Sequence, residues 1–144
     1  MIERDFFMRI LQEFFEAIAK LVRRHSKISD PDFSQIQEQF NEMYEQFFRI
    51  PAEHYYQMSE DKILNELENE GRSENDMFAK MQMLSELLYQ DAHIKKNKQE
   101  RIDLLKKSLY LLEHINSNSR TFSWDRGLRI SDIKKELMEF KTSD

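Results

Sequence analysis

Residues 2–22 read IERDFFMRILQEFFEAIAKLV, a run in which apolar side chains recur every three or four positions. That spacing places them on one broad face of a helix, which we predict over about residues 3–25. Burial of one Phe or Leu side chain stabilises a fold by roughly 1.5–3 kcal/mol, so an uncovered face would lose much of a domain's stability. We therefore expect another helix, or another subunit, to cover it.

Helix-start and helix-stop signals predict a second helix after this one. Ser29-Asp30-Pro31 favours a helix start, since Asp30 can accept hydrogen bonds from free backbone N–H groups and Pro31 suits the first helical position. Pro51 disfavours helix at the residue before it and should end this helix. Residues 51–58 are then a connector or a short helical piece.

The same signals continue through the rest of the chain. Ser59 is expected to cap a third helix, which Gly71 terminates in the left-handed conformation. Ser73 and Asp76 resemble a capping pair that opens a fourth helix. A fifth helix is expected over about residues 98–115, then an irregular stretch, then a last helix over about 124–140. The apolar stripe of the last helix is predicted to contain Leu128, Ile130, Ile133, Leu137 and Phe140.

Few helix-breaking residues interrupt this pattern, because the 144 residues include only two Gly and two Pro. We predict an all-α fold, an irregular bundle of five to six helices that forms a single domain over residues 1–144. Residues 1–50 are expected to form an N-terminal helical hairpin. Residues 59–140 follow, with a tight hairpin at Gly71-Arg72.

The hairpin over residues 60–90, with the helix that begins at 98, resembles the helical pairs of tetratricopeptide-like proteins. Gly71 and Gly127 do not repeat at the ~34-residue period of a true array. The start MIERDFFMRI (1–10), the turn at 64–71 and the helix at 128–137 together resemble a family of short, uncharacterised bacterial helical proteins of tetratricopeptide-like character. This resemblance implies tetratricopeptide-like helices over 59–140 and implies no activity.

Composition argues against several classes of function. The net charge of −5 repels phosphate at long range, so we predict no nucleic-acid partner. The absence of Cys removes disulfides, thiolate nucleophiles and cysteine metal sites, which suits a reducing compartment. No run approaches the about 20 uncharged apolar residues of a transmembrane helix. We expect a cytoplasmic protein without membrane insertion.

A search for catalytic, cofactor-binding or metal-binding residues predicts none. None of the four His residues has a second His or a Glu at the three- or four-residue offset that aims two ligands from one helix face. The chain contains no Gly-rich phosphate loop and no Gly-x-Ser-x-Gly turn. Neighbouring carboxylates such as Glu60 and Asp61 are typical of a hydrated helix surface.

Charge is distributed unevenly along the chain. Acidic residues dominate residues 60–76, and basic residues dominate residues 95–107. One hypothesis is that the basic segment binds phosphate or an acidic partner. The alternative is that acidic and basic helices lie near each other, or simply keep opposite surfaces hydrated.

Two places carry candidate partner-binding residues. The first is the apolar face of the first helix, through which we expect self-association, as a homodimer. The second is the irregular stretch before the last helix, which holds residue types that dominate binding hot spots. Its alternative role is that the two aromatic rings tuck under the loop and seal the end of the bundle. The candidate residues are Phe6, Phe7, Ile10, Phe14, Phe122, Trp124 and Arg126.

These observations predict a non-enzymatic protein-interaction or self-assembly module whose partner is another protein or a second copy. No cofactor is expected. Two alternatives stay open, a small-ligand-binding regulatory domain and an enzyme without a recognisable motif. A polar-lined pocket would favour the first, and carboxylates or histidines with a perturbed pKa inside a cleft would favour the second.

Overall fold

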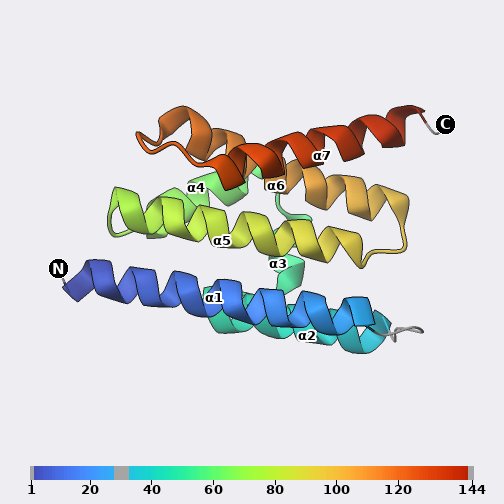
Figure 1. The fold of residues 1–144 in the computed structure, drawn as a ribbon, viewed down its shortest axis with the longest axis horizontal. Helices are drawn as coiled ribbons and strands as arrows, with labels where there is room; N and C mark the ends of the chain where they lie inside the picture. The colour runs from blue at the N-terminus through green and yellow to red at the C-terminus, as the bar shows by residue number, and fades with distance from the viewer. Residues whose placement is uncertain (1, 28–32, 143–144) are drawn as a thin grey trace. The chain divides into compact units, whose positions relative to one another are not determined.

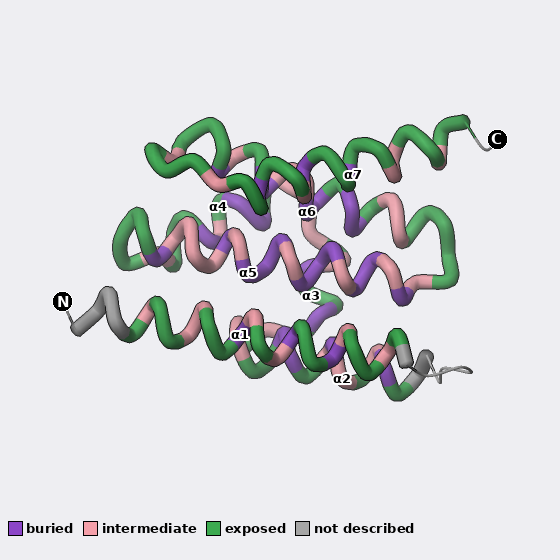
Figure 2. Tube along the Cα trace, in the orientation of Figure 1, coloured by how far each residue is buried: buried purple, intermediate pink, exposed green. Residues whose placement is uncertain are grey.

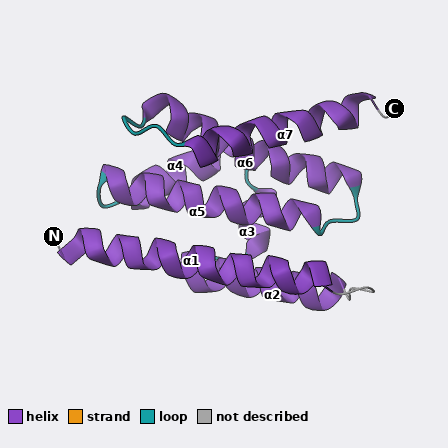
Figure 3. Cartoon of the chain, viewed as in Figure 1, coloured by secondary structure: helices purple, strands orange, loops and turns teal. Residues whose placement is uncertain are grey.

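A computed structural model of the chain describes residues 2–27 and 33–142, which contain helices joined by loops and no strand (Figures 1 and 3). The all-α prediction is confirmed, with seven helices in these ranges instead of five to six. The extra helix is the short segment after Pro51, which two breaks in the helical backbone separate from its neighbours. The helices are α1 (Ile2–Lys27), α2 (Phe33–Phe48), α3 (Ala52–Gln57), α4 (Glu60–Glu70), α5 (Glu74–His93), α6 (Lys98–Asn118) and α7 (Trp124–Thr142).

The chain divides into two compact units, Met1–Met58 and Ser59–Asp144, which we call the N-terminal and C-terminal units. The N-terminal unit contains α1 to α3, and the C-terminal unit contains α4 to α7. Each unit is described by itself, and the single domain over residues 1–144 stays a prediction.

In the N-terminal unit, α2 covers the apolar face of α1, which is one of the two covers that the sequence predicts. The two helices run in opposite directions (Figure 1). Phe14 is fully buried, and its ring centroid lies 5.1 Å from that of Phe47 and 6.5 Å from that of Phe48. Phe40 and Tyr44, which precede Phe47 on α2, are also buried. The predicted cap at Ser29-Asp30-Pro31 lies outside the described residues.

The turn after α2 shows why the segment after Pro51 is a separate helix. Arg49 has a φ of 59°, a left-handed conformation that stops α2, and its N–H donates to the carbonyl of Glu45. Pro51 then occupies the N-cap of α3 with an extended backbone. Met58, also extended, ends α3 after six residues, so the chain turns twice within a short span.

In the C-terminal unit, α5 and α6 form a closely packed antiparallel pair. Their contact centres on Ser85 and Ser108, which are both fully buried. The Ser85 hydroxyl donates to the Ser108 carbonyl oxygen at 3.0 Å, and the Ser108 hydroxyl donates to the Ser85 carbonyl oxygen at 2.8 Å. The two hydroxyl oxygens lie 2.8 Å apart. Small side chains at a crossing point let two helices approach closely, and these two also satisfy each other's polar groups.

Side-chain caps fix where the helices of this unit begin. Ser59 Oγ accepts a hydrogen bond from the N–H of Lys62, and Ser73 Oγ accepts one from the N–H of Asp76. Both predicted caps are therefore confirmed. The Asp76 carboxylate accepts in turn from the N–H of Arg72 at 3.0 Å, so the capping pair fixes the chain that enters α5.

Gly71 joins α4 to α5, but the predicted left-handed conformation is wrong. Its φ is −67° and its ψ is 129°, an extended backbone that any residue adopts. Glycine is needed here for a different reason, because a Cβ would lie 2.9 Å from the Cβ of Met77 and 3.3 Å from its Cα. A side chain would push the end of α4 away from the first turn of α5.

The prediction for the apolar stripe of the last helix, α7, is wrong at one residue. Ile130 and Ile133 are buried as predicted, but Leu128 is 58% exposed. Leu128 precedes Ile130 by two residues, which is about 200° around a helix, so the two cannot share a face. No helix within the described ranges is long and apolar enough to cross a membrane.

Candidate interaction surface on α7

The helix α7 has two faces of different character, which heptad letters describe. If Trp124 is placed at position d and Leu128 at position a, every residue at positions a, d, e and g is exposed. Every residue at positions b, c and f is buried or half-buried, including Arg126, Ile130 and Ile133. Figure 2 shows the contrast with α5, which is buried or half-buried over most of its length. A pattern with this period is typical of a helix that presents a straight seam to a second helix.

The exposed a and d positions from Trp124 to Met138 form what we call the outer stripe, Trp124, Leu128, Ser131, Lys135 and Met138. Three of its five side chains are large and apolar. Trp124 is 74% exposed, Leu128 58% and Met138 65%. The sequence predicts Trp124 as a candidate, but it misses Leu128 and Met138. The alternation of four- and three-residue steps from Trp124 is the signal that would have revealed them.

The two edges of the outer stripe carry opposite charges. Position e is acidic in each of its three occurrences, with Asp125, Asp132 and Glu139. Position g carries Lys134 and Lys141. Its third occurrence is Gly127, where a Cβ would meet nothing within 4 Å. An apolar seam between an acidic and a basic edge is a surface on which charge can select the partner and its direction.

Phe122 lies just before the stripe, on a loop that the buried side chain of Arg126 holds in place. Its ring is 74% exposed and meets that of Trp124 edge to face, with centroids 5.6 Å apart. The two rings therefore do not seal the end of the bundle. Arg126, the third candidate here, is buried and fastens the loop, since its guanidinium donates to Asn116 Oδ1 at 3.1 Å and to the Thr121 carbonyl at 2.7 Å.

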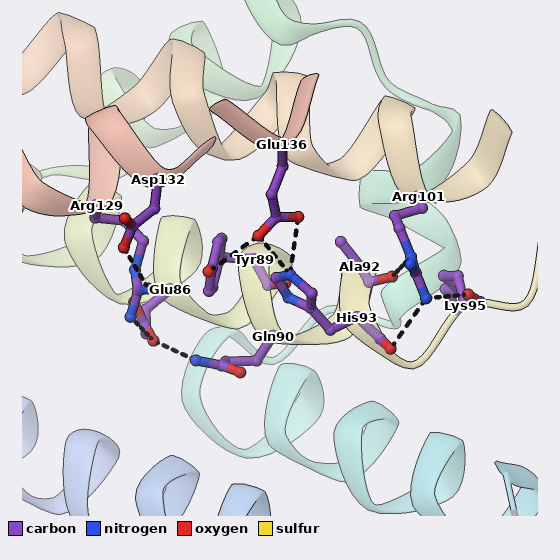
Figure 4. Close-up of polar contacts among 10 residues, drawn as sticks. All are labelled: Glu86, Tyr89, Gln90, Ala92, His93, Lys95, Arg101, Arg129, Asp132 and Glu136. Carbon is purple, nitrogen blue, oxygen red and sulfur yellow. Dashed lines mark hydrogen bonds and ion pairs between the residues drawn. The ribbon is translucent and has the colours of Figure 1, made fainter. Parts of the chain in front are cut away.

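Polar contacts at the b positions hold α7 against α5 (Figure 4). The Arg129 guanidinium donates two hydrogen bonds of 3.1 Å to the two carboxylate oxygens of Glu86. It also lies over the ring of Tyr89, 3.9 Å from the centroid. A paired guanidinium that also stacks on an aromatic ring has little freedom to move, so Arg129 fixes the rotation of α7 about its axis.

Two turns further along α7, Glu136 makes the second set of contacts with α5. His93 Nε2 lies 2.9 and 3.0 Å from the two Glu136 oxygens, and Tyr89 donates to Glu136 at 3.4 Å. His93 Nδ1 faces the Tyr89 carbonyl at 2.8 Å. The imidazole thus joins Glu136 of α7 to the backbone of its own helix, α5.

Burial and these charged neighbours change the pKa of the Tyr89 phenol. Burial raises the pKa of Tyr89 above its usual value, Arg129 lowers it, and the carboxylates of Glu136 and Asp132 raise it. The net effect favours the neutral phenol, which is the form that donates to Glu136. The contacts of Arg129 and Glu136 join α7 to α5, and we call this cluster the clamp.

Some basic residues of the segment 95–107 make contacts within the C-terminal unit, and others line a cavity. Arg101 donates to the carbonyls of Ala92, His93 and Lys95 at the end of α5 (Figure 4). Lys107 is buried and pairs with Asp103 at 2.8 Å. A cavity of about 640 Å³ receives Lys98 and Lys106, together with side chains of α7 that the sequence could not place there. Its lining is Asn97, Lys98, Gln99, Ile102, Lys106, Leu137, Phe140 and Lys141.

The candidate residues on α1 belong to the N-terminal unit and lie at different depths. Phe6 is 54% exposed, whereas Phe7 and Ile10 are half-buried. Phe14 has no exposed surface, because α2 covers it. Only the beginning of this face is therefore open in the N-terminal unit as described.

Within residues 2–27 and 33–142, no group of three or more His, Cys, Asp or Glu residues could hold a metal ion. Comparisons of the chain with protein-family models, with curated protein sequences and with solved structures found no match.

Proposed function

We propose that the chain is a protein-interaction module whose binding surface is the outer stripe of α7 together with Phe122. One observation carries this proposal. Among the described residues, six large apolar side chains are exposed, and four of them lie on this surface, namely Phe122, Trp124, Leu128 and Met138. Scattered exposed apolar residues are normal in proteins, but several of them along one face of a helix favour a binding surface.

The energetics of the surface support the proposal. Covering an apolar side chain of this size contributes roughly 1.5–3 kcal/mol, and Trp is a residue type that dominates binding hot spots. The clamp of Arg129 and Glu136 fixes the rotation of α7, and Arg126 fixes the loop before it. A surface that is already ordered loses little conformational entropy on binding. The partner element that fits best is a helix with its own apolar seam.

A photo-crosslinking amino acid in place of Ser131, at the centre of the outer stripe, tests this function. Expressed in the source cells and irradiated, this variant should give a covalent adduct with a protein. The adduct should fall at least tenfold when Leu128 and Met138 are also replaced by serine, because the apolar seam is then gone. Both residues are exposed, so these replacements should change the free energy of unfolding by less than about 0.5 kcal/mol each.

The matched control places the same crosslinker at Ser117, an exposed serine of α6 that lies outside the outer stripe. It should give no adduct above background. Equal labelling at the two positions, or no adduct at Ser131, would contradict the proposed function.

The cavity between α6 and α7 supports a second candidate function, the binding of an amphipathic anion. Ile102, Leu137 and Phe140 supply apolar walls, and Lys98, Lys106 and Lys141 supply positive charge around them. No carboxylate is among the lining residues. A carboxylate, sulfate or phosphate group attached to a short apolar chain matches this combination.

Titration calorimetry with decanoate tests the cavity. The double variant Lys106→Gln/Lys141→Gln should bind decanoate about tenfold more weakly than the unaltered chain, since two exposed charge contacts are lost. The variant Lys20→Gln, which removes an exposed lysine of α1, should bind it unchanged. If decanol binds as tightly as decanoate, the lysines play no part and this candidate fails.

A further inference from the structure

We infer that the outer stripe of α7 packs against the outer stripe of a second copy of the chain, with the two α7 helices parallel. This inference rests on the proposed function and names its partner. It differs from self-association through the first helix, because α7 belongs to the C-terminal unit.

The spacing of the exposed residues fits a pair of helices. Positions 124, 128, 131, 135 and 138 follow one another in steps of four, three, four and three, the pattern that keeps side chains at a two-helix seam. In a parallel pair related by two-fold symmetry, each a or d residue meets its own counterpart. Trp124 then lies against Trp124, Leu128 against Leu128, and Met138 against Met138.

The charges at the edges decide the partner and the direction. In a parallel pair, a g residue faces the e residue five positions further along the other helix. Lys134 then faces Glu139 of the second copy, and symmetry repeats the contact. In an antiparallel pair, e faces e and g faces g, which would set Asp125, Asp132 and Glu139 against one another. The chain is thus complementary to itself in the parallel arrangement only.

Forming this contact requires little rearrangement of the C-terminal unit. Lys134 Nζ lies 3.6 Å from a carboxylate oxygen of Glu113, and both side chains are exposed, so this ion pair contributes little and is easily exchanged. Ser131 and Lys135 place polar groups inside the seam, which weakens the pair while favouring two strands. The seam is also short. We therefore expect a reversible dimer that depends on protein concentration.

Sedimentation velocity of the full chain over a range of concentrations is the first test. The dimer should weaken roughly tenfold in Lys134→Glu, because two attractive contacts become repulsive. The added change Glu139→Lys should restore it, since the pairs then return with reversed sign. A chain that stays monomeric, or a dimer that Lys134→Glu leaves unchanged or strengthens, would overturn the inference.

The direction of pairing has its own test, helped by the absence of native Cys. Met138→Cys should form a disulfide-linked dimer in a glutathione buffer, because parallel pairing brings the two positions together. Ser117→Cys is the matched exposed control and should remain unlinked. A mixture of Trp124→Cys and Met138→Cys chains should give no mixed disulfide. A mixed product in place of the Met138→Cys dimer would show antiparallel pairing and overturn the inference.

The mass of the Ser131 adduct separates this inference from the function on which it rests. An adduct of two copies of the chain supports both. An adduct with a different protein keeps the proposed function and overturns self-pairing. Absence of any adduct overturns the proposed function itself.

Discussion

Replacement of Phe14 by alanine is expected to lower the free energy of unfolding of the N-terminal unit by about 3–5 kcal/mol. Phe14 has no exposed surface, and its ring meets those of Phe15, Phe47 and Phe48. Its removal leaves a cavity between α1 and α2 that the three remaining rings cannot fill without moving. Hydrogen exchange measured by mass spectrometry should show faster exchange in peptides from both helices.

The matched control is Phe6→Ala, the same chemical change on the same helix at a side chain that is 54% exposed. It should change the free energy of unfolding by less than about 1 kcal/mol, because little packing is lost. Similar effects of the two substitutions would contradict the placement of Phe14 in the core.

Replacement of Ser85 by leucine is expected to destabilise the C-terminal unit by about 3 kcal/mol. The hydroxyl of Ser85 lies 2.8 Å from that of Ser108, so the larger side chain has no space unless α5 and α6 separate. Chemical denaturation followed by circular dichroism measures the loss. Hydrogen exchange in α5 and α6 should locate it.

Two further variants identify the cause. Ser85→Ala removes the hydrogen bonds of the Ser85 hydroxyl, keeps the one that the residue 85 carbonyl accepts from Ser108 and adds no bulk, so it should cost only about 1 kcal/mol. Ser117→Leu adds the same bulk at an exposed position and should be nearly neutral. If Ser85→Ala is as damaging as Ser85→Leu, then hydrogen bonding and not close packing holds the two helices together.

The positions of the helices were predictable because they depend on local chemistry. Apolar residues at three- and four-residue spacing and the caps at Ser59 and Ser73 are properties of short stretches of chain. The role of Gly71 was not, since its close approach to Met77 arises only when α4 and α5 fold back on each other. The tetratricopeptide-like character of residues 59–140 and a cytoplasmic location stay predictions.

The candidate surface was predictable only in part. Phe122 and Trp124 stand out by residue type, but the sequence left open whether their rings bind a partner or seal the bundle. The clamp was not predictable, because Glu86 and Arg129, like His93 and Glu136, lie 43 residues apart. Their meeting depends on how α5 and α7 align across α6, and no local pattern encodes that alignment.

The contacts within the C-terminal unit also determine how a newly made chain would fold. α5 packs on α4 and α6, α4 also contacts α6, and α7 packs on α6 with the clamp to α5. Helical proteins with such local contacts fold in microseconds to milliseconds, whereas a ribosome adds only about 5–20 residues per second. Each helix therefore finds its neighbour already in place as it emerges. α7 is made after α4, α5 and α6, so the proposed binding surface emerges only when the helices that hold it in place have already been made.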